Sequence, residues 1–126
     1  MFNCSIYISV KWSRRELAAQ LHNLLGGVLS RFSFIENDDY ELDIEENDEF
    51  DEEKQKSFPD GFLYFRYIVF IEFKNEVSGN YYQQEISRIL KWLWSNGVAA
   101  VASCDYERLL LEQGGYNNRS VPWIAG

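Results

Sequence analysis

Apolar and polar residues alternate at the start of the chain, the pattern of a strand with one buried and one open face. Cys4, Ile6 and Ile8 are the apolar set, and polar residues lie between them. We therefore predict a first strand over residues 2–11. A last strand is predicted over residues 98–104, where small and β-branched side chains gather.

Two further strand patterns occupy the middle of the chain. Residues 28–35 are apolar enough to start a strand, and Tyr40–Glu45 alternates strictly. These residues form either one extended segment or two segments broken near Asn37. After the turn residues that begin at Pro59, the stretch Phe62–Phe73 is largely apolar on both faces, which predicts a long strand in the middle of a sheet.

Other segments have the spacing of amphipathic helices. Ser13 begins a capping box, Ser-Arg-Arg-Glu, leucines follow at helical spacing, and Gly26-Gly27 supply the stop. A second helix is expected to open at Ser78 and to close at Asn96-Gly97. A short third helix is expected over residues 105–113.

The predicted order is strand, helix, strand, strand, helix, strand, which is the split βαβ arrangement (βαββαβ) of ferredoxin-like domains. The expected fold class is therefore α+β, with an antiparallel sheet and both helices on one face. The first and third strands are expected at the centre of the sheet and the second at an edge. The 126 residues suit a single domain, with an acidic loop over about residues 45–60 and a tail over 114–126.

The sequence holds little of the chemistry that enzymes use. It has one histidine, His22, and no ligand spacing typical of a metal site. Cys4 and Cys104 are expected as buried free thiols, because a disulfide would need neighbouring strands and an oxidising compartment. We find no signal-peptide pattern and no apolar run of the roughly 20 residues that span a bilayer. We predict a cytoplasmic protein without catalytic activity or cofactor.

The acidic residues are strongly clustered. Twelve of them lie between Glu36 and Glu53 with no Lys or Arg among them, whereas the rest of the chain has eight acidic and twelve basic residues. The net charge of −8 therefore arises in one segment, where potentials add and steer a basic partner. A simpler alternative is that acids on an edge strand prevent pairing with other sheets, and that the loop is only solvated.

Neither a metal site nor an acid–base pair is expected from this segment. A calcium loop needs a glycine at its turn, and none occurs between Glu36 and Glu53. Catalytic carboxylates need different environments that separate their pKa values, whereas acids on one exposed strand and loop share the same solvent.

Residues 60–67, DGFLYFRY, partly resemble the RNP1 motif of the RNA-recognition-motif family. Tyr7, Phe62 and Tyr64 would project from the open sheet face, where that family stacks bases. An acid replaces the first basic residue of the motif, and the acids of the neighbouring strand would repel a phosphate backbone. We therefore expect no direct nucleic-acid binding, and expect these aromatics to pack either under the tail around Trp123 or under a partner protein.

A small acidic domain with a dense negative segment and spare aromatics resembles the immunity proteins that accompany bacterial polymorphic or contact-dependent toxins. The resemblance lies in size, charge and predicted architecture over the whole chain. It implies a stoichiometric inhibitor that occupies the cationic groove of a basic toxin, such as a nuclease. The expected partner-binding residues are Asp38, Asp39, Tyr40, Glu41, Asp43, Glu45, Glu46, Asp48, Glu49, Phe50, Asp51 and Phe58.

Two other functions fit the same features. A regulatory or ligand-sensing ferredoxin-like domain would dimerise through its open sheet face, so a homodimer is an alternative expectation. A phage-type nucleic-acid mimic would share the electrostatics and act on host proteins. In each case we expect no contact with a membrane.

Overall fold

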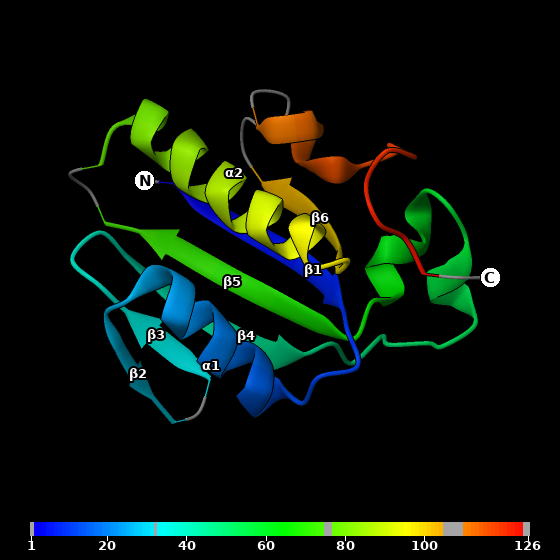
Figure 1. Cartoon of the computed structure of the whole chain (residues 1–126), viewed down its shortest axis with the longest axis horizontal. Coiled ribbons are helices and arrows are strands. Elements are labelled where there is room, and N and C mark those ends of the chain that lie inside the picture. The colour runs from blue at the N-terminus through cyan, green and yellow to red at the C-terminus, as the bar shows by residue number, and fades with distance from the viewer. Residues whose placement is uncertain (1, 32, 75–76, 105–109, 125–126) are drawn as a thin grey trace.

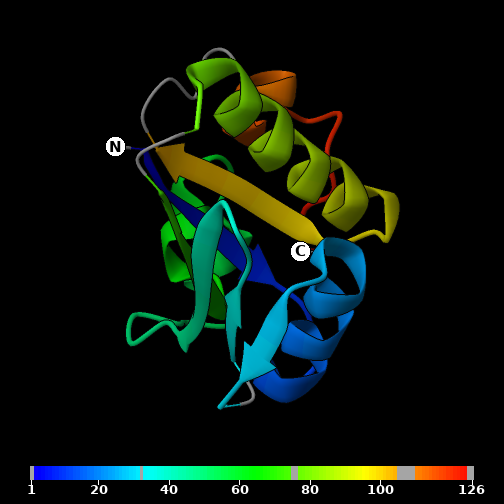
Figure 2. The same cartoon turned by 90° about the vertical axis from the view of Figure 1, so that its left-hand side faces the viewer.

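The computed structural model describes residues 2–31, 33–74, 77–104 and 110–124. It has an α+β fold, in which α1 (Arg14–Leu25) and α2 (Gly79–Ser95) lie on one face of a six-stranded antiparallel sheet (Figures 1 and 2). The sheet order is β2-β3-β4-β5-β1-β6. The strands are β1 (Asn3–Ser9), β2 (Val28–Ser30), β3 (Phe34–Glu36), β4 (Tyr40–Glu46), β5 (Tyr67–Phe73) and β6 (Ala99–Cys104).

Both long helices begin and end as their local sequences predict. The Ser13 hydroxyl accepts a hydrogen bond from the Glu16 amide at 3.1 Å, and the Ser78 hydroxyl accepts one from the Tyr81 amide at 3.1 Å. Gly26, with φ of 72°, ends α1 in the left-handed region that glycine favours. The third helix was expected over residues 105–113, of which 105–109 lie outside the described residues; Leu111–Gly115 form a 3-10 turn, η4.

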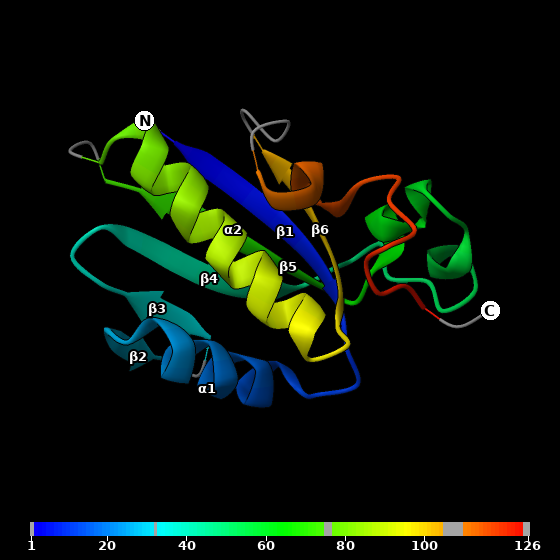
Figure 3. The same cartoon turned by 45° about the horizontal axis from the view of Figure 1, so that its top comes forward.

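The acidic strand β4 is not at an edge of the sheet, which corrects the expected position. β2 and β3 pair as antiparallel neighbours, and β3 pairs in turn with β4 (Figure 3). Asn37 causes the reversal between β3 and β4, because its Oδ1 accepts hydrogen bonds from the amides of Asp39 and Tyr40 at 2.8 and 2.9 Å. Of the two alternatives for this segment, the break near Asn37 is confirmed. The strand order therefore differs from that of a simple four-stranded ferredoxin sheet.

The strand expected from Phe62 begins only at Tyr67. The residues before it form part of the β4–β5 loop (residues 47–66), which contains the 3-10 helices η1 (Lys54–Lys56) and η2 (Asp60–Tyr64). Gly61 passes so close to the chain that a Cβ atom there would lie 2.6 Å from the Gln55 carbonyl oxygen. The loop is therefore folded back on itself and does not extend the sheet.

Two hydrophobic cores cover opposite faces of the sheet. The main core lies under α1 and α2 and includes Ile6, Val69 and Ile86. The second core is smaller and lies over β1 and β6, where Phe62, Phe65, Ala99 and Val101 are buried and Tyr7, Trp123 and Ile124 pack against them. The tail therefore covers aromatics of the open face, as expected. Since Phe62 is buried, it is not available to stack with bases.

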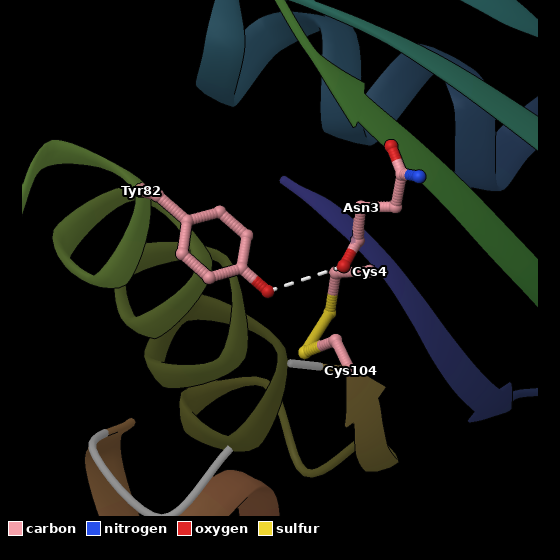
Figure 4. Close-up of a disulfide and its surroundings, with 4 residues drawn as sticks. All are labelled: Asn3, Cys4, Tyr82 and Cys104. Atoms are coloured by element: carbon pink, nitrogen blue, oxygen red, sulfur yellow. Dashed lines mark hydrogen bonds between the residues drawn. A yellow bond between two sulfur atoms is a disulfide. The ribbon is translucent and has the colours of Figure 1, made fainter. Parts of the chain in front are cut away.

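Cys4 and Cys104 form a disulfide, so the expectation of free thiols is wrong (Figure 4). The reason is register: β1 and β6 are antiparallel neighbours that place the two cysteines directly opposite each other, with Cα atoms 4.4 Å apart. Beside them, the Tyr82 hydroxyl donates to the Asn3 carbonyl oxygen at 3.2 Å. Among the described residues, neither long helix has the length and apolar character needed to cross a membrane.

Candidate functional site

The part of the open sheet face that β3, β4, β5 and β1 form contains a groove of about 500 Å³. Six side chains define what we call the acidic groove: Phe34, Glu41, Asp43, Glu45, Phe70 and Glu72. Phe70 is one of these side chains and is 45% exposed. The groove is therefore an exposed surface that combines aromatic side chains with carboxylates.

Strand register arranges these side chains in rows across the sheet. Glu36, Glu41 and Glu72 are directly opposite one another on β3, β4 and β5. The next row on the same face is Phe34, Asp43 and Phe70. Directly opposed like charges destabilise a sheet, so the row of three glutamates has a free-energy cost in the isolated protein.

Asp43 is the carboxylate with the most perturbed ionisation in this groove. Desolvation between its neighbours, together with a hydrogen bond and charge repulsion from Glu45, raises its pKa to about 6, and the Arg14 charge partly opposes that rise. The folded protein therefore binds a proton at Asp43 more tightly than the unfolded chain does. Consequently its contribution to stability decreases as the pH rises from about 4 to 6.

Asp43→Asn is therefore expected to increase the free energy of unfolding at pH 7 by about 1 kcal/mol, after allowance for solvent screening at a partly exposed site. At pH 3 the difference should vanish, because the carboxyl is then protonated in both states. Urea unfolding at the two pH values measures this. Asp48→Asn removes the same charge from the exposed loop and is the control; a gain at pH 3 equal to that at pH 7 would contradict the assignment.

Few of the groove carboxylates are neutralised by the protein itself. Arg14 lies 3.8 Å from Glu45, and Lys74 lies 3.4 Å from Glu36, just outside the groove. Both pairs are substantially exposed and are worth at most about 1 kcal/mol each. Within the described residues, Glu41, Asp43 and Glu72 have no ion pair within 4.0 Å.

The structure does not bring all the predicted partner-binding residues together. Of the twelve, the groove contains Glu41, Asp43 and Glu45. Asp38 and Asp39 lie in the β3–β4 turn, where Asp39 accepts a hydrogen bond from the Tyr81 hydroxyl at 2.6 Å. Glu46 lies opposite Tyr67 at the end of β4 and is exposed. The alternation along β4 assigns its side chain to the face of the sheet opposite the groove.

The remaining predicted residues lie in the β4–β5 loop, with the exception of Tyr40. Asp48, Glu49 and Phe50 are exposed, whereas Asp51 is partly buried and its carboxylate accepts from the amides of Lys54 and Glu53, which lowers its pKa. Phe58 is partly buried against Trp123, with the Arg119 guanidinium over its ring. Tyr40 is wrong as a contact residue: its side chain is 0% exposed in the main core, because it alternates with Leu42 and Ile44.

No protein-family model, no curated protein and no solved structure matches this chain. In the described part of the chain, no three His, Cys, Asp or Glu side chains are grouped as a metal site. The function is therefore argued from the geometry of the acidic groove.

Sequence reasoning missed three of the residues that shape this surface, namely Phe34, Phe70 and Glu72, whereas Glu36 already belongs to the acidic segment that the sequence identifies. The alternation of buried and exposed residues along β5 places Phe70 and Glu72 on the face of the sheet away from the main core. This alternation is the sequence signal that could have identified them. Their position next to Asp43 and Glu41 depends on pairing between strands, which a single sequence does not state.

Proposed function

We propose that this protein is a stoichiometric inhibitor of a basic protein, of the kind that immunity proteins provide against bacterial toxins. The observation that carries the proposal is the row of opposed glutamates, Glu36, Glu41 and Glu72, beside Asp43. A cationic surface of a partner relieves the repulsion among these carboxylates when it binds. The free protein thus holds an electrostatic cost that the complex removes.

The exposed aromatic side chains of the groove support a protein partner over a small ion. Carboxylates speed the encounter with a basic surface, whereas burial of an exposed aromatic such as Phe70 slows dissociation. A toxin that acts on nucleic acid has a cationic substrate groove of matching charge. If this protein occupied the toxin's cationic groove, it would exclude the toxin's substrate.

The same charges oppose other uses of this face. The glutamates repel the phosphate backbone of nucleic acid, and they also repel a second acidic groove in a homodimer built on this face. The proposal therefore retains a basic protein as partner, with no direct contact to nucleic acid or membrane, no cofactor and no catalytic residue.

We also propose that β4-β5-β1-β6 and the two helices form a ferredoxin-like split βαβ unit. The antiparallel order of these four strands and the position of both helices on one face support this description. The β2–β3 pair is then an addition beside β4.

The test is co-purification with a basic partner, for which the product of the adjacent upstream gene is the first choice. Glu41→Lys/Glu72→Lys should weaken the complex by at least about tenfold, because two attractive charges become repulsive. Asp48→Lys/Glu49→Lys makes the same change of charge in the exposed β4–β5 loop and is the matched control. Undiminished binding by the groove variant, or an equal loss in both variants, would reject the role assigned to this face.

The cytoplasm is the compartment in which we propose that the complex forms. Since cytoplasmic conditions reduce most disulfides, the binding assay is run on both the oxidised and the reduced protein. The six side chains that define the groove come from β3, β4 and β5, and Cys4, which also lines the groove, has its side chain buried in the main core with the disulfide. Binding is therefore expected to be the same in both forms.

A further inference from the structure

The central carboxylate of the acidic groove stands between two phenylalanines. Phe34 on β3 and Phe70 on β5 are both paired with Asp43 on β4, and all three line the groove. Neither ring belongs to the main core or to the second core. Packing in the protein interior therefore does not explain why two large aromatics flank this carboxylate.

We propose that the groove is a subsite for an arginine side chain of the partner, with its guanidinium between Phe34 and Phe70 and paired with Asp43. This inference rests on the proposed function and names the side chain that the basic partner contributes.

The spacing of the sheet suits a planar cation. The strands that carry the two rings are two strand separations apart, about 10 Å. A planar group in contact with an aromatic side chain on each side needs about 7 Å, so there is room for one above Asp43 when the two rings lean toward it. A guanidinium is planar, stacks on aromatic faces and donates two parallel hydrogen bonds to one carboxylate. A lysine ammonium is a strongly hydrated point charge that gains less from the rings.

The charges around Asp43 favour a cation at this point. Glu41 and Glu45 flank it along β4, and Glu72 lies diagonally across on β5. Arg14 is paired with Glu45, at one end of this row along the strand. Asp43 is partly desolvated, and attraction between unlike charges is stronger where water is partly excluded. The centre of the groove is therefore where an incoming guanidinium gains most.

The probes are two capped tripeptides, Gly-Arg-Gly and Gly-Lys-Gly, titrated into the ¹⁵N-labelled protein and followed by NMR. We expect the arginine peptide to bind about threefold more tightly, the factor that a cation–π contact with exposed rings provides. Its shifts should centre on the amides of Phe34, Asp43 and Phe70. Phe70→Leu should lower the affinity for the arginine peptide to that for the lysine peptide. Phe50→Leu, the same change at a phenylalanine 43% exposed outside the groove, should not.

Each outcome bears on one proposal. Equal affinities for the two peptides, or shifts centred outside the groove, overturn the arginine subsite. They leave the proposed function intact if Glu41→Lys/Glu72→Lys still weakens binding of the basic protein. Asp43→Asn, which preserves side-chain shape, should weaken both peptides, and unchanged arginine binding by this variant also overturns the subsite.

Discussion

Replacement of both cysteines, Cys4→Ser/Cys104→Ser, is expected to lower the free energy of unfolding by about 4 kcal/mol relative to the oxidised protein. The cysteines are 100 residues apart in the sequence, so the bond closes a loop of most of the chain and restricts the unfolded state. Among the buried side chains of β6, Ala99, Ala100 and Ala102 are small and bury little apolar area, so the disulfide adds to a strand that packing stabilises little. Urea unfolding of the oxidised protein and the variant measures the difference.

Two controls make this result specific to the disulfide. Reduced wild-type protein should unfold at the same urea concentration as the variant, and reductant should not affect the variant. Ser103→Ala changes an exposed residue of the same strand and should alter stability by no more than about 0.5 kcal/mol. The expectation fails if the oxidised protein is no more stable than the double variant.

Local sequence signals were sufficient for the two helices. Ser13 and Ser78 cap α1 and α2 through bonds to amides three residues away, and Gly26 ends α1 within one residue of its last turn. Such signals depend only on residues that are neighbours in the chain. The amino-acid sequence alone therefore contains all of them.

The sheet depends on more distant contacts, and the predictions for it were less accurate. β2 and β3 have three residues each, too few for a periodicity to distinguish them from one longer strand. The segment from Phe62 to Phe73 is largely apolar on both faces throughout. However, the Asn47 side chain donates hydrogen bonds to the carbonyls of Leu63 and Phe65, and this first part lies outside the sheet. No pattern within the segment reveals a partner so far away in the sequence.

The same distinction applies to the acidic groove. Alternation along β4 correctly placed Glu41, Asp43 and Glu45 on one face, away from Leu42 and Ile44. That alternation also assigns Tyr40 to the core, so charge clustering was the wrong guide for this residue. Phe34, Phe70 and Glu72 belong to the acidic groove because of the register between strands, and register is a property of the folded sheet.

Asn47→Ala is expected to lower the free energy of unfolding by about 3 kcal/mol. The Asn47 side-chain nitrogen donates to the carbonyl oxygens of Leu63 and Phe65 at 2.9 and 2.7 Å, and its Oδ1 accepts from the Glu49 amide at 3.0 Å. Alanine leaves these three backbone groups without the partner that holds the β4–β5 loop. Urea unfolding measures the loss, and Asn80→Ala, at an exposed position of α2, is the control that should change stability little.

The same variant separates the two surfaces that contain the predicted contacts. Loss of Asn47 loosens the loop with Asp48, Glu49 and Phe50, whereas the groove is built on strands that the main core holds. Under conditions where the variant remains folded, its affinity for a basic partner should therefore change by less than about threefold, a shift of under about 0.7 kcal/mol. The opposite pair of results, loss of binding with Asn47→Ala and normal binding with Glu41→Lys/Glu72→Lys, would assign docking to the loop and reject the open sheet face.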